Sequence, residues 1–209
     1  MKKTGIYIKA AILLRNGRII KDDVVIFRSA EKGVLFLNEA YERLAVNYPR
    51  FYKMDTLSKM GTVAAAVLLK DSFDPAARQP DEAGIVLSNR NASIEADAQY
   101  WEASQEYPSP ALFVYTLPNI VIGELSIRYQ FKGENAFFVS EAFDAEWLHW
   151  YVTDLMTRNL LKTCMCGWLD VFDDQLDACL FLVESDTSET GSTFTAENLK
   201  SIYNKNYGK

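Results

Sequence analysis

The sequence predicts an α/β fold with three layers, in which helices cover both faces of one mixed and mostly parallel sheet. Strand-like apolar runs alternate with segments of helical periodicity, which indicates parallel strands joined by helical crossovers. Residues 84–88 form a short continuous apolar run, as in a central strand that is covered on both faces. Few residues separate 163–171 from 178–184, so this last pair of strands is predicted to be antiparallel.

Residues 5–14 and 19–27 are the first two strand-like runs, rich in β-branched and large apolar residues. Asn16 and Gly17 lie between them. This dipeptide favours the positive φ angles of a two-residue turn, so the two runs are predicted to form a β-hairpin.

Two helices are predicted next. The apolar spacing is helical from Gly33, and Tyr48-Pro49 ends it. Asp55 and Ser58 are suited to cap a second helix over 59–70. Small side chains in that helix allow another element to pack closely against it: Gly61, Ala64, Ala65 and Ala66.

The middle of the chain alternates between loops, a strand and helices. Two prolines and scattered charges predict a loop at 74–82, before the strand at 84–88. Helices are predicted over 94–103 and 119–129, with a break at 108–110. The apolar stripe expected on the second of these helices consists of Ile120, Gly123 and Ile127.

The last part of the domain is predicted to begin with a strand over 136–140. Asp144 then starts the helix with the strongest apolar periodicity, and the two strands at 163–171 and 178–184 follow. We expect one domain over 1–184. The tail at 185–209 opens with polar residues and has only weak helical character, so we expect it to be loosely docked or disordered.

The amino-acid composition argues against nucleic-acid binding, a membrane span and a metal site. The 209 residues carry a net charge of −6 with scattered acidic residues, so no basic face for nucleic acid is expected. No apolar run approaches the ~20 residues of a membrane span, and no signal peptide is evident, so we expect a cytoplasmic protein. The three cysteines are expected to be buried free thiols, because a single histidine, His149, offers too few ligands for a metal site.

The segment from Met54 to Glu184 resembles the N-terminal half of the β-ketoacyl synthases. The most specific part is 109–127, which is similar to the family's Ser-Pro-x-x-Phe, Thr-x-x-Asn and Gly-x-x-(Ala/Ser)-Ile pattern. Lys132-Gly133 matches the loop before the nucleophile strand, and 166–170 is similar to the Gly-Gly-x-(Asp/Glu) turn. The resemblance implies a thiolase-like half-domain with a five-stranded sheet and no cofactor.

The resemblance also implies that catalysis is lost. The family's nucleophile lies in a Ser-Thr-Ala-Cys-(Ala/Ser)-x-Gly elbow, whose helix start lowers the thiol pKa. The corresponding stretch here is 139–146, where Phe143 falls on the cysteine and Glu146 on the glycine, and no cysteine is present in any register. The family takes its two catalytic histidines from a C-terminal half that has no counterpart in this sequence, and His149 is expected to have a surface or packing role. The chain is therefore predicted not to be an enzyme.

In the family, the segment matching 113–127 lies at the dimer interface. The side chains expected to form an interface or an acyl pocket are Phe113, Leu117, Asn119 and Phe143. The leading hypothesis is a chain-length-factor-like partner of a full-length ketosynthase in fatty-acid, polyketide or aryl-polyene biosynthesis, paired through the edge strand 136–140. An exposed Trp150 would favour such a partner.

Three alternatives remain open from the sequence. The chain could be a self-associating homodimeric remnant without a ligand. It could also bind acyl chains or acyl-carrier protein, which predicts a deep cavity beneath Phe113, Leu117 and Phe143. It could also be an enzyme of another kind, which would have to use the polar cluster at 88–93. The simpler interpretation of this cluster is a loop that follows a strand.

Overall fold

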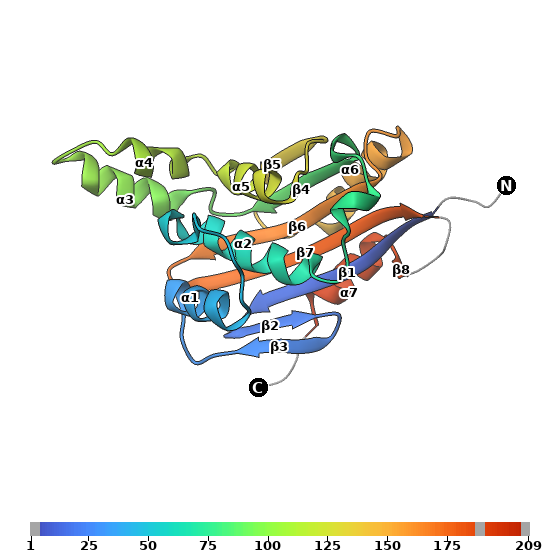
Figure 1. The fold of residues 1–209 in the computed structure, drawn as a ribbon, viewed down its shortest axis with the longest axis horizontal. Helices are drawn as coiled ribbons and strands as arrows, with labels where there is room; N and C mark the ends of the chain where they lie inside the picture. The colour runs from blue at the N-terminus through green and yellow to red at the C-terminus, as the bar shows by residue number, and fades with distance from the viewer. Residues whose placement is uncertain (1–4, 187–190, 206–209) are drawn as a thin grey trace.

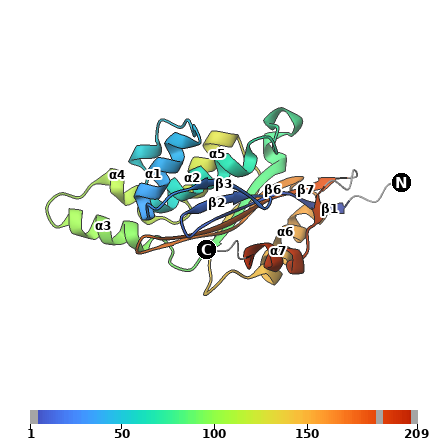
Figure 2. The ribbon, with the colours of Figure 1, turned by 90° about the horizontal axis from the view of Figure 1, so that it is seen from below.

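The computed structural model describes residues 5–186 and 191–205. In this part of the chain, one mixed sheet has the strand order β3-β2-β1-β7-β6-β4-β5, with β8 paired to β1. Figures 1 and 2 show α1, α2 and α5 on one face of this sheet and α6 and α7 on the other. The predicted α/β class with a mixed sheet between helical layers is confirmed.

The strands are β1 Gly5–Arg15, β2 Arg18–Lys21, β3 Val24–Arg28, β4 Ala83–Asn89, β5 Asn135–Val139, β6 Thr163–Phe172, β7 Gln175–Asp186 and β8 Ser192–Thr193. The α-helices are α1 Gly33–Arg43, α2 Thr56–Leu69, α3 Ile94–Ser104, α4 Pro110–Phe113, α5 Ile120–Tyr129, α6 Ala145–Thr157 and α7 Ala196–Tyr203. Short 3₁₀ turns are η1 Phe51–Lys53, η2 Pro75–Ala77, η3 Pro80–Glu82 and η4 Val114–Thr116.

The sheet differs from the prediction in strand number and in strand direction. It has eight strands rather than five, and among the described strands only the pairs β4–β5 and β4–β6 are parallel. The run at 19–27 breaks at Asp22 and Asp23, which have φ angles of 47° and 70°, so it forms two strands. Because successive hairpins join β1, β2 and β3 and another joins β6 and β7, most neighbours are antiparallel.

The local turn and cap predictions are confirmed. Asn16 and Gly17 have φ angles of 52° and 69° in the turn between β1 and β2. Asp55 caps α2 by accepting a hydrogen bond from the Ser58 amide (3.1 Å). Gly61 of α2 brings α5 close: a Cβ atom placed there would lie 2.4 Å from the Val121 side chain.

The apolar stripe predicted on α5 is wrong. Val121, Ile122 and Leu125 are buried in the core, whereas Ile127 is 58% exposed and Gly123 faces open space. Three apolar residues in succession start this helix, so its sequence fits more than one face. The contact with α2 selects the face that carries Val121 and Leu125.

The described part of the C-terminal tail is docked, in contrast to the loose docking or disorder expected for it. β8 pairs with β1, and Phe194 and Leu199 are buried against the α6 side of the sheet. Thr195 caps α7 by accepting a hydrogen bond from the Asn198 amide (3.2 Å). A short amphipathic helix can therefore complete this side of the core despite its polar composition. Residues 187–190 and 206–209 of the predicted tail lie outside the described residues.

Between residues 5 and 205, leaving out 187–190, no single helix has the length and apolar composition to cross a bilayer. The helical segments 110–116 and 120–129 together have this length and apolar composition, but the two are bent by 97° relative to each other.

Candidate functional site

The loop between β5 and α6 contains the position at which the resemblance places a nucleophile. The Ser140 amide donates to the Asn89 carbonyl (2.8 Å), which joins the start of this loop to the carboxyl end of β4. Asp144 caps α6 by accepting a hydrogen bond from the Trp147 amide (3.0 Å). Glu146 lies in the first turn, where a negative charge interacts favourably with the helix dipole. The helix start is thus stabilised by acidic side chains.

Phe143 fills the centre of this loop with its own side chain. It is half-buried, and its ring centroid lies 4.5 Å from that of Tyr203 on α7 and 6.3 Å from that of Phe181 on β7. Rings from three separate parts of the chain therefore occupy the space beside the helix start. Their contacts stabilise a closed arrangement rather than an open cleft.

Tyr203 is held in this position by a polar network. Its hydroxyl donates to Asp177 (2.8 Å), and Arg15 forms an ion pair with the same carboxylate (2.8 Å). The Arg15 guanidinium also donates to the Tyr203 carbonyl (3.0 Å) and lies 4.4 Å from the centroid of its ring. Burial, followed by the nearby charge of Asp177, raises the pKa of Tyr203. The hydroxyl therefore stays protonated as a donor over a wide pH range.

Phe113, Leu117 and Asn119 do not meet Phe143 in a common cavity. All three are exposed, and five cavities found in the described chain are lined by other residues. The acyl-binding alternative predicts a deep cavity beneath Phe113, Leu117 and Phe143. Phe113 and Leu117 lie on the surface of the protein instead.

Phe113 and Leu117 belong to an exposed apolar region, which we call the arm and define as residues 94–117. Figures 1 and 2 show α3 and α4 of the arm projecting beyond the end of the sheet. Trp101 is 69% exposed, Tyr107 84%, Phe113 52% and Leu117 49%. Exposed apolar side chains of this size and number on one projection are typical of a protein interface.

A loop at 89–93 connects the arm to the sheet. Asp170 of β6 accepts hydrogen bonds from the amides of Arg90 and Asn91, both at 3.0 Å, and from the Asn91 side chain at 2.9 Å. The Ser93 hydroxyl donates to the Thr116 carbonyl within the arm (2.6 Å). The polar cluster at 88–93 therefore organises the base of the arm, which agrees with its interpretation as a loop after a strand.

The other candidate groups pack within the protein. The His149 ring packs 5.4 Å from the ring of Phe194, which is one of the two roles expected for it. Cys164, Cys166 and Cys179 are buried free thiols, as predicted, and burial raises the pKa of Cys166 and Cys179. In the described part of the chain, no cluster of three or more potential metal-binding side chains is found.

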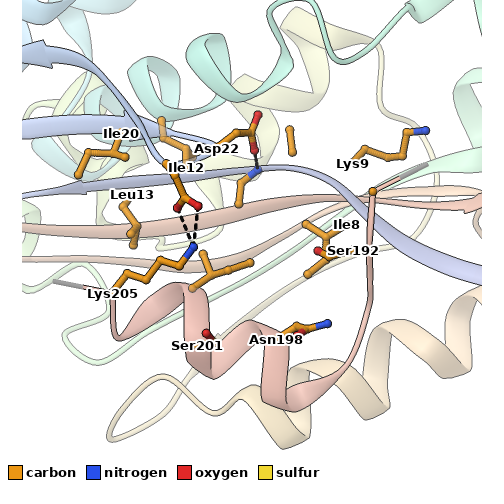
Figure 3. Close-up of a pocket in the computed structure, with 15 residues that line it drawn as sticks. Ile8, Lys9, Ile12, Leu13, Ile20, Asp22, Ser192, Asn198, Ser201 and Lys205 are labelled. Carbon is orange, nitrogen blue, oxygen red and sulfur yellow. Dashed lines mark hydrogen bonds and ion pairs between the residues drawn. The ribbon is translucent and has the colours of Figure 1, made fainter. Parts of the chain in front are cut away.

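Figure 3 shows a cavity of about 400 Å³ between β1 and α7. Its charged side chains already have partners within the chain. Asp22 accepts a hydrogen bond from the Ala11 amide (2.8 Å), and Lys205 forms an ion pair with Asp23 (2.7 Å) across the opening. The first contact lies within the N-terminal hairpins, and the second joins them to the segment after α7, so the cavity has a structural explanation.

No protein-family model and no curated protein matches the sequence. Solved structures do match. The ishigamide ketosynthase/chain length factor has a TM-score of 0.63 at 15% identity, covering 90% of this chain and 64% of that one. A type II polyketide synthase acyl-carrier protein in complex with its ketosynthase, AntDE:AntF, gives 0.60 at 14% identity, covering 88% and 63%.

A third match is the ketosynthase ApeO in complex with its chain length factor ApeC from Xenorhabdus doucetiae. Its TM-score is 0.56 at 12% identity, and the match covers 96% of this chain and 91% of that one. The chain spans less than two thirds of the first two structures. It has the thiolase-like fold of ketosynthases and chain length factors, which confirms the fold that the resemblance implied.

Sequence reasoning missed three parts of this region. It did not find Tyr203 as the side chain that covers Phe143, the three hydrogen bonds accepted by Asp170, or the exposed side chain of Trp101 on α3. The only local signal was the apolar character of Tyr100 and Trp101 in a helix with few other apolar residues.

Proposed function

We propose that this chain is a non-catalytic, ketosynthase-like subunit that binds a full-length ketosynthase, as a chain length factor does. The observation that carries the proposal is that edge strand β5 and the apolar arm are both exposed, while the loop that would hold a nucleophile is filled by Phe143 and Tyr203. The fold similarity to ketosynthase complexes supports the choice of partner.

The edge of β5 offers hydrogen-bonding groups to a partner strand. β5 pairs with β4 on one side and forms one edge of the described sheet. The Ser140 amide points towards β4, so by the alternation along a strand the amides of Val139 and Phe137 point outwards. An unpaired edge of this kind readily adds a strand from another chain.

Aromatic side chains also adjoin this edge. Phe138 of β5 contacts Trp147 and Tyr151 of α6, with ring centroids 4.4 and 5.3 Å apart, so α6 packs beside the edge strand. On the same helix, Trp150 is 63% exposed. Exposed tryptophan commonly contributes strongly to binding, so the exposure of Trp150 supports a partner surface on this side of the protein.

The same surface could join two copies of this chain. The test is therefore the mass of the purified protein in solution by light scattering, measured alone, with a ketosynthase encoded nearby, and with acyl-carrier protein. We expect a one-to-one complex with the ketosynthase. A stable homodimer that binds neither the ketosynthase nor the acyl-carrier protein would establish a self-associating domain and refute the proposal.

Val139 provides a variant that tests the edge itself. Val139→Pro removes an outward amide without removing a bond to β4, and proline is tolerated on edge strands where the amide faces solvent. It should weaken the complex at least tenfold, since strand addition depends on such main-chain bonds. The matched control, Val139→Thr, keeps the amide and the β-branched shape, and it should bind within about twofold of the original chain.

A further inference from the structure

A second cavity lies on the face of the sheet covered by α1, α2 and α5 (Figure 2). Its volume is about 520 Å³, within the range of small-molecule sites. The C-terminal ends of α1, α2 and α5 meet there beside edge strand β3. Its walls are mainly apolar and include Ile26, Leu44, Val46, Val67, Leu69 and Phe73.

The charged groups of this cavity are predominantly positive. Lys21, Lys70 and Arg128 line it, and Asp71 is the one carboxylate among its described lining residues. The Lys21 ammonium donates to the Lys70 carbonyl, and burial lowers the pKa of Lys21. A group of cations beside apolar walls favours an anion that carries an apolar body.

Arg128 and Tyr129 line the cavity and carry unsatisfied polar atoms beneath its surface. Arg128 Nη1 and the Tyr129 hydroxyl are buried and have no hydrogen-bond partner among the described residues. The Arg128 guanidinium instead lies near the rings of Tyr48 and Tyr129, 5.1 and 5.2 Å from their centroids. A buried polar atom without a partner costs free energy, so an acceptor brought by a ligand would be stabilised here.

The geometry points to a binding site in this cavity for a small apolar molecule with a carboxylate group. The carboxylate lies against Arg128 and Tyr129, because guanidinium and hydroxyl groups can both donate to its oxygens. The apolar body lies against Val46, Val67 and Phe73. This inference is independent of the proposed ketosynthase partner, since the cavity shares no lining residue with β5 or the arm.

Calorimetric titration of the full chain with octanoate, and separately with octan-1-ol, tests the charge requirement. We expect saturable binding of octanoate and at least tenfold weaker binding of octan-1-ol, because the alcohol cannot form the charge-assisted hydrogen bonds of the carboxylate. Equal binding of the two, or no saturable binding of octanoate, would overturn the inference. This comparison requires no variant to fold.

Two variants locate the site. Arg128→Gln should weaken octanoate binding about tenfold. Arg158→Gln should have no effect, since it removes an exposed guanidinium directly after α6, a helix that lies on the opposite face of the sheet (Figure 2). Ala66→Phe should abolish binding by filling the cavity from α2, where Ala66 is half-buried. Unchanged binding by Arg128→Gln or Ala66→Phe, each shown to be folded by circular dichroism, would place the ligand elsewhere and refute the site.

Discussion

Asp170 is predicted to control both the stability of the protein and the position of the arm. Replacing Asp170 with alanine removes the acceptor for three hydrogen bonds, from the Arg90 amide, the Asn91 amide and the Asn91 side chain. These bonds fix the loop between β4 and α3. Without them, the base of the arm is no longer joined to β6.

The size of the effect follows from how far water can replace the carboxylate. A hydrogen bond to a charged group typically contributes ~1.5–3 kcal/mol. Arg90 is exposed, so water replaces its bond, whereas the two bonds from Asn91 are partly buried. We therefore expect Asp170→Ala to lower the free energy of unfolding by about 2 kcal/mol, and the melting temperature by roughly 4–8 °C for a chain of this size.

Urea unfolding followed by circular dichroism measures this change. Asp170→Asn keeps one acceptor oxygen for the two amides but faces the Asn91 side chain with a donor, so a loss of about 1 kcal/mol is expected. Asp81→Ala is the control, since Asp81 is exposed on η3, and it should change stability by less than about 0.5 kcal/mol. If Asp170→Ala is as stable as this control, the loop does not depend on the carboxylate and the reasoning fails.

Three further predictions concern the sheet and the closed loop. Phe143→Ala should lower the free energy of unfolding, measured by urea titration, by about 2 kcal/mol. This is roughly half the loss for a fully buried phenylalanine, because the ring is half-buried. An unchanged free energy of unfolding would show that the ring does not stabilise the loop. Gly167→Ala should lower the free energy of unfolding by about 3 kcal/mol or more, because Gly167 has a φ of 146° and a Cβ atom would lie 2.0 Å from the Cys179 carbonyl oxygen. Near-normal expression and a near-normal melting temperature of this variant would contradict the requirement for glycine at this position. Since the pKa of Tyr203 is raised on folding, its contribution to stability is fully present below pH ~10 and is lost as the pH rises above that value, by at most about 1.4 kcal/mol per pH unit. Tyr203→Phe should therefore lose less stability than the original chain between pH 9 and pH 11. Equal losses would show that the pKa of Tyr203 is not raised on folding.

Features specified by neighbouring residues were predictable from the sequence. The turn at Asn16-Gly17 depends on the φ angles that these two residues tolerate, and the start of α2 depends on a bond from Ser58 to Asp55 within one turn. The fold class was predictable for a related reason. Alternation of strand and helix patterns is a property of the chain itself, and the resemblance at 109–127 added the type of fold.

Features that depend on distant contacts were not predictable. Asp170 accepts from Arg90, which is 80 residues away in the chain, and no local pattern links the two. The buried face of α5 was mistaken because several apolar residues at its start fit different faces, and contact with α2 decides between them. The strand count was wrong in part because a turn divides the run at 19–27 into two strands and because β8 lies in the segment predicted as a tail. The turn at Asp22-Asp23 has positive φ angles, which aspartate adopts only in some contexts.

The C-terminal helix links these observations to the proposed function. Tyr203 of α7 contacts Phe143 and is joined by Asp177 and Arg15 to β7 and β1, so the closed state of the loop depends on a segment that follows the last long strand. An open nucleophile site would require this helix to leave and Phe143 to change its conformation, with loss of the buried contacts of Leu199. The exposed edge of β5 and the arm need no such rearrangement before they bind a partner. Opening the loop costs free energy, whereas binding at β5 and the arm does not require it. This difference supports the proposed function as a binding partner.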